Sequence, residues 1–103
     1  LRKGMEGIRD AVSSFYEGKF EQGDATSLAA AIDKNVSLMI ENCDLQPKAD
    51  ATLHALLGTI LDGKTRLLQN PHEKTGMNRI IDALHKYPEY FAHEDWQPPA
   101  VDH

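Results

Sequence analysis

The sequence predicts an all-α fold, an antiparallel up-down-up-down four-helix bundle. Apolar residues recur three and four positions apart in four separate stretches, which is the period of an amphipathic helix. Short segments with Gly, Pro or Asn separate the stretches, and short links favour antiparallel neighbours. No window shows the two-residue alternation that a half-buried strand requires. Together these observations favour helices packed on helices.

The first two helices are predicted from their apolar stripes. One runs from Leu1 to about Glu17, before Gly18, with its stripe at Met5, Ile8, Val12 and Phe15. The second follows a loop and takes Asp24 as its N-cap. Its stripe is Leu28, Ile32, Val36, Met39 and Cys43, and it closes over 42–46. A bend back at the loop near Glu21 sets Met39 opposite Lys3, within a turn of Met5.

The third helix is predicted from Pro47 to about Leu68, with Pro47 in the first position, where its missing N–H costs nothing. This is the most apolar of the four stretches, with leucine and isoleucine at Leu53, Leu56, Leu57, Ile60, Leu61, Leu67 and Leu68. Ala51, Ala55 and Gly58 form a stripe of small residues, which we interpret as a place where a neighbouring helix packs closely. The pattern supplies no reason for Gly63, which disfavours a helix interior.

The fourth helix is predicted from Met77 to Tyr87, because Pro88 disfavours helical geometry in the residue before it. The aromatic segment that follows contains Tyr90, Phe91 and Trp96, and we expect it to fold across one end of the bundle. The domain therefore covers residues 1–96, and residues 97–103 are expected to form a flexible tail.

Composition limits the classes of function. The chain has 103 residues, enough for one domain with its own core, and a net charge of −5. That charge argues against nucleic-acid binding, and no apolar run is long enough to span a bilayer. One cysteine permits no internal disulfide. Because the chain begins at Leu1, we expect removal of an upstream segment and export, with a soluble, periplasmic location.

Reflecting the helices through their links predicts a cluster of metal-binding side chains at one end of the bundle. The residues are Met5, Met39, Cys43, His54 and His93. Thioether, thiolate and imidazole groups are the ligands of soft and borderline transition metals, so the cluster predicts a copper or zinc site. Plain packing is the alternative for the two methionines and the cysteine, and a hydrogen-bonded core histidine is the alternative for His54.

His54 has the most specific expectation. It lies between Leu53 and Leu57, and the reflected register places it opposite Glu89 and Tyr90. We therefore expect His54 to be largely buried beside the segment that begins at Pro88. His85, on a polar face, is expected to be solvated.

Two further classes of function are weighed against metal binding. An enzyme is not expected, because no nucleophile triad, acid–base pair or glycine-rich phosphate loop is present. An interaction module without a small ligand is the main alternative. It would meet a protein partner or a second copy through an apolar strip on the bundle surface or through the Tyr90–Trp96 segment.

The whole pattern resembles the small exported four-helix bundles grouped with cytochrome b562 and cytochrome c′. The segment N-C-x-L-x-P-x-A-D-x-x-L-H, with Y-F-x-H-x-x-W near the end, also resembles small bundles of bacterial exported proteins. The resemblance to cytochrome b562 implies haem binding, with Met5 and His93 in the places of the two axial ligands. The c′ type requires CxxCH near its C-terminus, and this chain has no such motif.

Overall fold

The computed structural model describes residues 2–17, 22–42, 45–70, 73–91 and 96. These residues form four helices and no strand, which confirms the all-α prediction for this part of the chain. The helices are α1 (Arg2–Glu17), α2 (Gln22–Asn42), α3 (Pro47–Gln69) and α4 (Lys74–Tyr90). The predicted tail, residues 97–103, lies outside the described residues.

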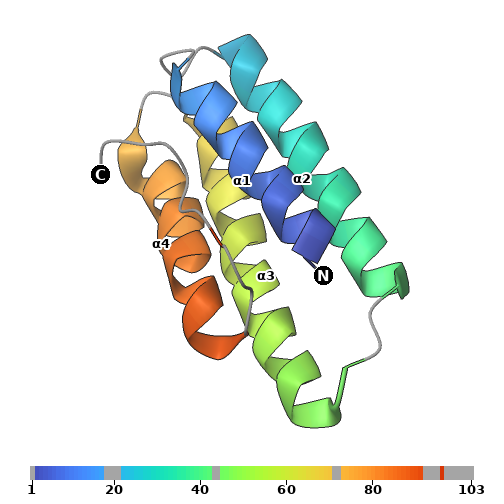
Figure 1. Ribbon diagram of the computed structural model, residues 1–103. Helices are drawn as coiled ribbons and strands as arrows, with labels where there is room; N and C mark the ends of the chain where they lie inside the picture. The colour runs from blue at the N-terminus through green and yellow to red at the C-terminus, as the bar shows by residue number, and fades with distance from the viewer. Residues whose placement is uncertain (1, 18–21, 43–44, 71–72, 92–95, 97–103) are drawn as a thin grey trace.

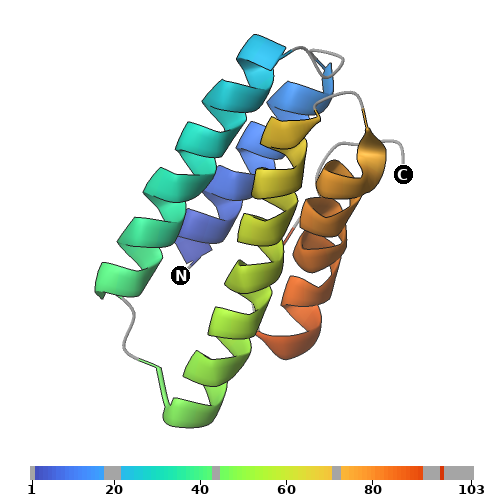
Figure 2. The ribbon, with the colours of Figure 1, turned by 180° about the vertical axis from the view of Figure 1, so that it is seen from behind.

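The four described helices lie side by side (Figures 1 and 2). The most extensive contact is between α3 and α4, followed by that between α1 and α2, and α1 and α4 touch least. The radius of gyration is 12.9 Å, close to the roughly 13 Å of a folded domain of about 100 residues. The seam between α1 and α4 is therefore the least closed side of the bundle.

Every described helix contributes one apolar stripe to a common core. Met5, Ile8 and Val12 of α1 have no exposed surface, and Ile32 and Met39 of α2 are also buried. The buried residues of α3 and α4 are Leu53, Leu56, Leu57, Ile60, Gly63, Leu67, Gly76, Met77, Ile80, Ile81, Ala83, Leu84 and Tyr87. The stripes predicted from periodicity are thus largely confirmed. Leu68 is an exception, because it is 43% exposed at the end of α3.

Three helix boundaries differ from the sequence prediction, and one of them is the start of α4, which is Lys74 and not Met77. Helix α2 begins at Gln22, so the predicted N-cap at Asp24 is wrong. Helix α4 contains Pro88 and continues to Tyr90, so the predicted end at Tyr87 is also wrong. Pro88 lies in the last turn, where a proline removes few helical hydrogen bonds. The Phe91 N–H donates to the Tyr87 carbonyl (3.1 Å) and closes that turn.

Two glycines explain the close approach of α3 and α4. A Cβ on Gly63 would lie 2.6 Å from the Gly76 carbonyl oxygen, and a Cβ on Gly76 would lie 2.6 Å from the Gly63 carbonyl oxygen. Each helix therefore rests on the backbone of the other. Gly58 differs, because nothing lies within 4 Å of a Cβ built there. The interpretation that a neighbouring helix of this chain packs on Gly58 is wrong.

Candidate functional site

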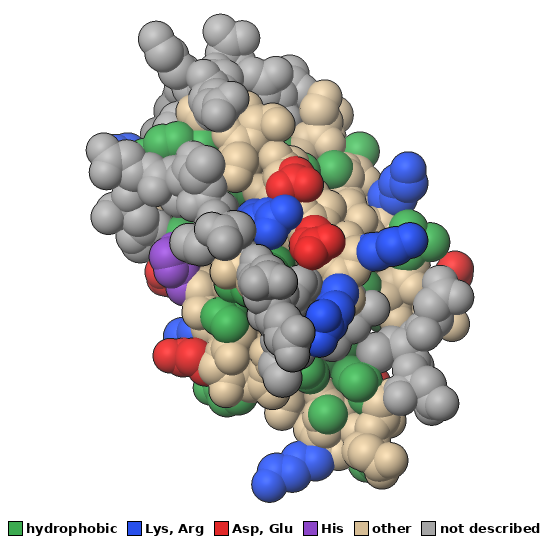
Figure 3. Space-filling view, viewed as in Figure 1, with side chains coloured by type: hydrophobic (Ala, Val, Ile, Leu, Met, Phe, Trp, Pro, Cys, Tyr) green, Lys and Arg blue, Asp and Glu red, His purple; other side chains and the backbone are tan. Residues whose placement is uncertain are grey.

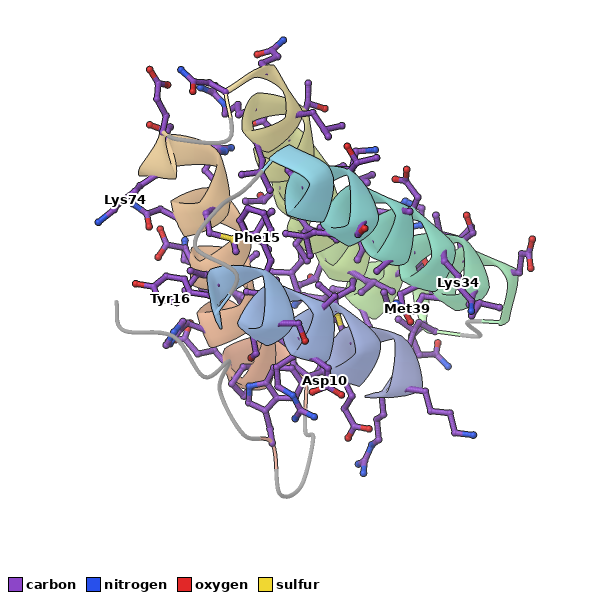
Figure 4. All side chains as sticks on the ribbon, turned by 90° about the horizontal axis from the view of Figure 1, so that it is seen from above. Asp10, Phe15, Tyr16, Lys34, Met39 and Lys74 are labelled. Atoms are coloured by element: carbon purple, nitrogen blue, oxygen red, sulfur yellow. The ribbon has the colours of Figure 1, made fainter. Side chains whose placement is uncertain are left out.

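The two methionines of the predicted metal cluster lie in the core. Met5 is fully buried and Met39 is 2% exposed. Met39 lies between α1 and α2 (Figure 4), and its side chain packs so tightly on Gly4 that a Cβ there would clash with it. The predicted level of Met39, opposite Lys3 and within a turn of Met5, is therefore confirmed. Gly4 is the residue that lets the two helices approach at this level.

His54 does not lie where the sequence predicted it. Its side chain is 58% exposed, and its Nε2 lies 3.5 Å from an Asp50 carboxylate oxygen one turn earlier on α3. The expectation that His54 is buried is wrong. Successive residues of a helix are rotated by about 100°. Leu53 and Leu57 both point into the core, and that rotation turns His54 past Leu53 onto the solvent side.

The predicted metal cluster has two further members. Cys43 and His93 lie outside the described residues, so only Met5 of the haem-ligand pair Met5 and His93 is described. Among the described residues, no group of three or more His, Cys, Asp or Glu side chains is arranged to hold a metal ion. The described part of the predicted site is therefore divided, with two thioethers in the core and one imidazole in solvent.

The aromatic segment is divided in a similar way. The Phe91 ring stacks on Tyr87 with 5.7 Å between centroids, and the Trp96 ring meets Tyr87 edge to face at 4.8 Å. The Arg9 guanidinium of α1 lies 5.2 Å from the centroid of the Trp96 ring. Trp96 thus bridges α4 and α1 along their least closed seam. Phe91 and Trp96 thus pack on the bundle, and Trp96 lies beside Arg9 near the middle of α1 rather than across one end, where the aromatic segment was predicted.

Tyr90 instead points away from the core. It is 60% exposed, the largest value among the large hydrophobic side chains of the described residues. A hollow of about 440 Å³ is lined by Ala51, Thr52, Ala55, Leu56, Thr59, Lys86 and Tyr90. A second hollow, of about 380 Å³, is lined by Gln46, Lys48, Ala49, Thr52, Tyr90 and Phe91. Both hollows share Thr52 and Tyr90, and we call their combined lining the Tyr90 face.

Small side chains line the α3 part of the Tyr90 face. Ala51 and Ala55 are exposed, and Gly58 continues the same helical line into open space. The hydroxyl groups of Thr52 and Thr59 donate to carbonyls one turn earlier in α3, at 3.1 and 3.2 Å. Their methyl groups and the alanine methyls therefore make up much of the surface that a partner would meet.

Positive charge borders the Tyr90 face. Lys48 and Lys86 line the hollows, and the described lining residues include no carboxylate. Further along the same pair of helices, Asp62 accepts hydrogen bonds from Arg66 (2.9 Å) and Arg79 (2.6 Å). The hydrogen bond from Arg66 and the positive charge of both arginines lower the pKa of Asp62.

A third hollow lies between α1 and α2. It measures about 210 Å³ and is lined by Ala11, Ser14, Phe15, Ser27 and Leu28. It is smaller than either hollow beside Tyr90, and no charged side chain is among its described lining residues. The Tyr90 face therefore offers more surface and more varied chemistry.

Comparisons with protein-family models, with curated proteins and with solved structures give no match. None of the described helices is long and apolar enough to cross a membrane. The functional assignment therefore depends on the geometry of the chain itself.

Several residues of the Tyr90 face are recognisable in the sequence, but the sequence does not show that they lie together. Ala51, Ala55 and Gly58 are recognisable as a stripe, and Tyr90 as an aromatic residue near the end of α4. The signal that the stripe faces solvent is its position opposite Leu53, Leu57 and Ile60 on the helix. Lys48 and Lys86 carry no such signal, because a single exposed lysine is common on any helix.

Proposed function

We propose that this chain is a protein-interaction module and that the Tyr90 face is its contact surface. The observation that carries the proposal is the exposed Tyr90 ring, which lines two hollows. Tyrosine is enriched at protein interfaces, because its ring supplies contact area at a low entropic cost. Phe91 and Trp96 are engaged with Tyr87, so Tyr90 is the aromatic residue of this segment that remains accessible to a partner.

Site-specific photocrosslinking in the source cells tests this proposal. A benzophenone side chain at position 90 should give a defined adduct with a partner chain. The matched control is position 78, because Asn78 is exposed on the same helix but does not line either hollow. No adduct from position 90, or the same adducts from both positions, would contradict the proposal.

Metal binding by Met5, Met39, Cys43, His54 and His93 is a second candidate function. The contact of Met39 with Gly4 supports one part of it, because it places the two thioether-bearing residues at one level of α1 and α2. Titration of the purified chain with Cu(I), Cu(II) and Zn(II) tests this candidate. Binding that is no tighter than in a His54→Ala, His93→Ala double variant would end it. The haem alternative, with Met5 and His93 as ligands, is tested by adding haemin and recording the Soret band.

We also propose that the bundle has the antiparallel up-down-up-down order. The short links and the glycine contacts support this order, since Gly63 near the end of α3 meets Gly76 near the start of α4. In the same way, Gly4 near the start of α1 meets Met39 near the end of α2. A spin label near the start of α1 should broaden NMR signals near the end of α2 and not near its start.

A further inference from the structure

We propose that the partner of the Tyr90 face is an acidic amphipathic helix of another protein. This inference rests on the proposed function and adds the chemistry of the partner. One apolar side chain of the helix would enter each hollow beside Tyr90, and its carboxylates would face Lys48 and Lys86.

Charge is the first reason. The chain has a net charge of −5, with 16 Asp and Glu against 11 Lys and Arg. On the face that Figure 3 presents, acidic and basic side chains are interspersed. The Tyr90 face differs, because Lys48 and Lys86 line it and Asp50 and Glu89, the nearest carboxylates in sequence, do not. A positive strip attracts the carboxylates of a partner and repels the same strip on a second copy of the chain.

The positive strip extends along the two helices. Arg79 precedes Lys86 by seven residues on α4, and Arg66 follows Thr59 by seven residues on α3. Seven residues are about two helical turns, so both arginines lie on the same side of their helices as the hollows. Asp62 joins these two arginines and neutralises one of their charges. Asp82 lies between Arg79 and Lys86 on α4, so the positive charge that a bound segment would meet is greatest at Lys48 and Lys86.

Shape is the second reason. The described residues present no strand edge, so a partner strand would have no backbone to pair with. Side chains one turn apart on a helix are about 5–6 Å apart, a spacing that can straddle one aromatic ring. Tyr90 lines both hollows, and the methyl-sized residues Ala51 and Ala55 let a helix backbone approach α3. This is the arrangement of a helix docked in a groove.

A designed peptide tests the partner class with the full chain. The probe is a fluorescein-labelled helical peptide of four turns, with leucines one turn apart on one face and glutamates elsewhere. The matched peptides carry lysine in place of glutamate, or alanine in place of leucine. In fluorescence anisotropy the acidic leucine peptide should bind at least about tenfold more tightly than either match, a difference of about 1.4 kcal/mol.

Charge reversal identifies the surface. The double variant Lys48→Glu, Lys86→Glu should weaken binding of the acidic peptide by about tenfold or more. The control Lys34→Glu, Lys74→Glu makes the same charge change at exposed lysines outside the hollows, and Figure 4 shows Lys74 directed away from the bundle. It should change binding by less than about threefold, a screened long-range effect. Equal circular dichroism spectra and thermal midpoints would show that all variants fold.

Two results would overturn the inference. Equal binding of the acidic and basic peptides would exclude a partner chosen by charge. Equal losses of affinity for the acidic peptide in the two charge-reversal variants would exclude the Tyr90 face as the binding site of the peptide. If position 90 still crosslinks to a partner in either case, the interaction module stands and only the partner class is wrong. A chain that dimerises on concentration, and is made monomeric by Tyr90→Arg, would instead identify the occupant as a second copy.

Discussion

A difference of one helix position separates a core side chain from a solvated one on α3. Leu53 is 1% exposed, whereas the neighbouring His54 side chain is 58% exposed. The predicted level of His54 along the bundle, opposite Tyr90, agrees with the hollow that Thr52, Ala55 and Tyr90 line together. Its direction around the helix was not, because a residue at the border of an apolar stripe can turn either way.

The first prediction compares these two neighbours. His54→Ala should change the free energy of unfolding by less than about 0.5 kcal/mol, because the side chain is exposed. Leu53→Ala should cost about 2–5 kcal/mol through the cavity it leaves in the core. Urea denaturation followed by circular dichroism measures both. A large loss in His54→Ala would show that the imidazole makes contacts beyond its approach to Asp50.

The second prediction concerns the phenol of Tyr87. This side chain is fully buried, and burial raises its pKa from 10.0 to about 12. The native state therefore holds this proton more tightly than the unfolded state, so its contribution to stability is complete below pH 10 and is lost as the pH rises towards 12. The Tyr87→Phe variant lacks this proton and should show a shallower loss of stability over that range, measured by urea denaturation at each pH. Parallel losses in both proteins would contradict the assignment.

At the scale of helices, the glycines of α3 have opposite roles. Gly63 is buried against the backbone of α4, and Gly58 faces open space five residues earlier. The sequence does not distinguish the two glycines, because each is a residue that weakens a helix interior. The difference depends on the partner helix, which sequence periodicity locates only within about one turn.

The third prediction is that substitution by alanine changes the stability of the chain in opposite directions at these two glycines. Gly58→Ala should stabilise the chain by up to about 1 kcal/mol, because alanine is the better helix former and the added methyl group meets nothing. Gly63→Ala should destabilise it by about 1–3 kcal/mol, because the methyl group forces α3 and α4 apart. Thermal and urea denaturation of the two variants measure these changes in stability. Stabilisation by both substitutions would show that the helices do not cross at Gly63 and Gly76.

At the scale of the whole molecule, Trp96 closes the side of the bundle that the helices leave most open. It contacts Tyr87 of α4 through its ring edge and Arg9 of α1 through its face. Of the helix pairs in contact, α1 and α4 touch each other least, and Trp96 adds a contact to both of them. The Tyr90 face, the proposed contact surface, lies elsewhere, between α3 and α4, and Figure 2 shows α3 in front with α4 beside it.

The fourth prediction follows from this closure. Trp96→Ala should destabilise the chain by about 0.5–3 kcal/mol, because Tyr87 loses an aromatic partner and gains contact with water. The variant should also bind more of a dye that recognises exposed apolar surface. Arg9→Gln is the comparison and should cost less than about 1 kcal/mol, since it removes the cation and keeps much of the stem. In the parent chain, fluorescence of the single tryptophan should shift to the red at the unfolding transition.

The sequence by itself determined the all-α class, the core stripes and the approximate helix limits, because these depend on local periodicity and on Pro47 at a helix start. It also placed Met39 at the level of Met5, since a short link sets how two neighbouring helices align. Only the tertiary structure decided that His54 is solvated, that Gly63 meets Gly76, that Trp96 bridges α4 to α1, and that Tyr90 lines two hollows bordered by lysines. Those features depend on the rotation of each helix about its axis and on which helices touch, and neither is encoded in the period of one helix alone.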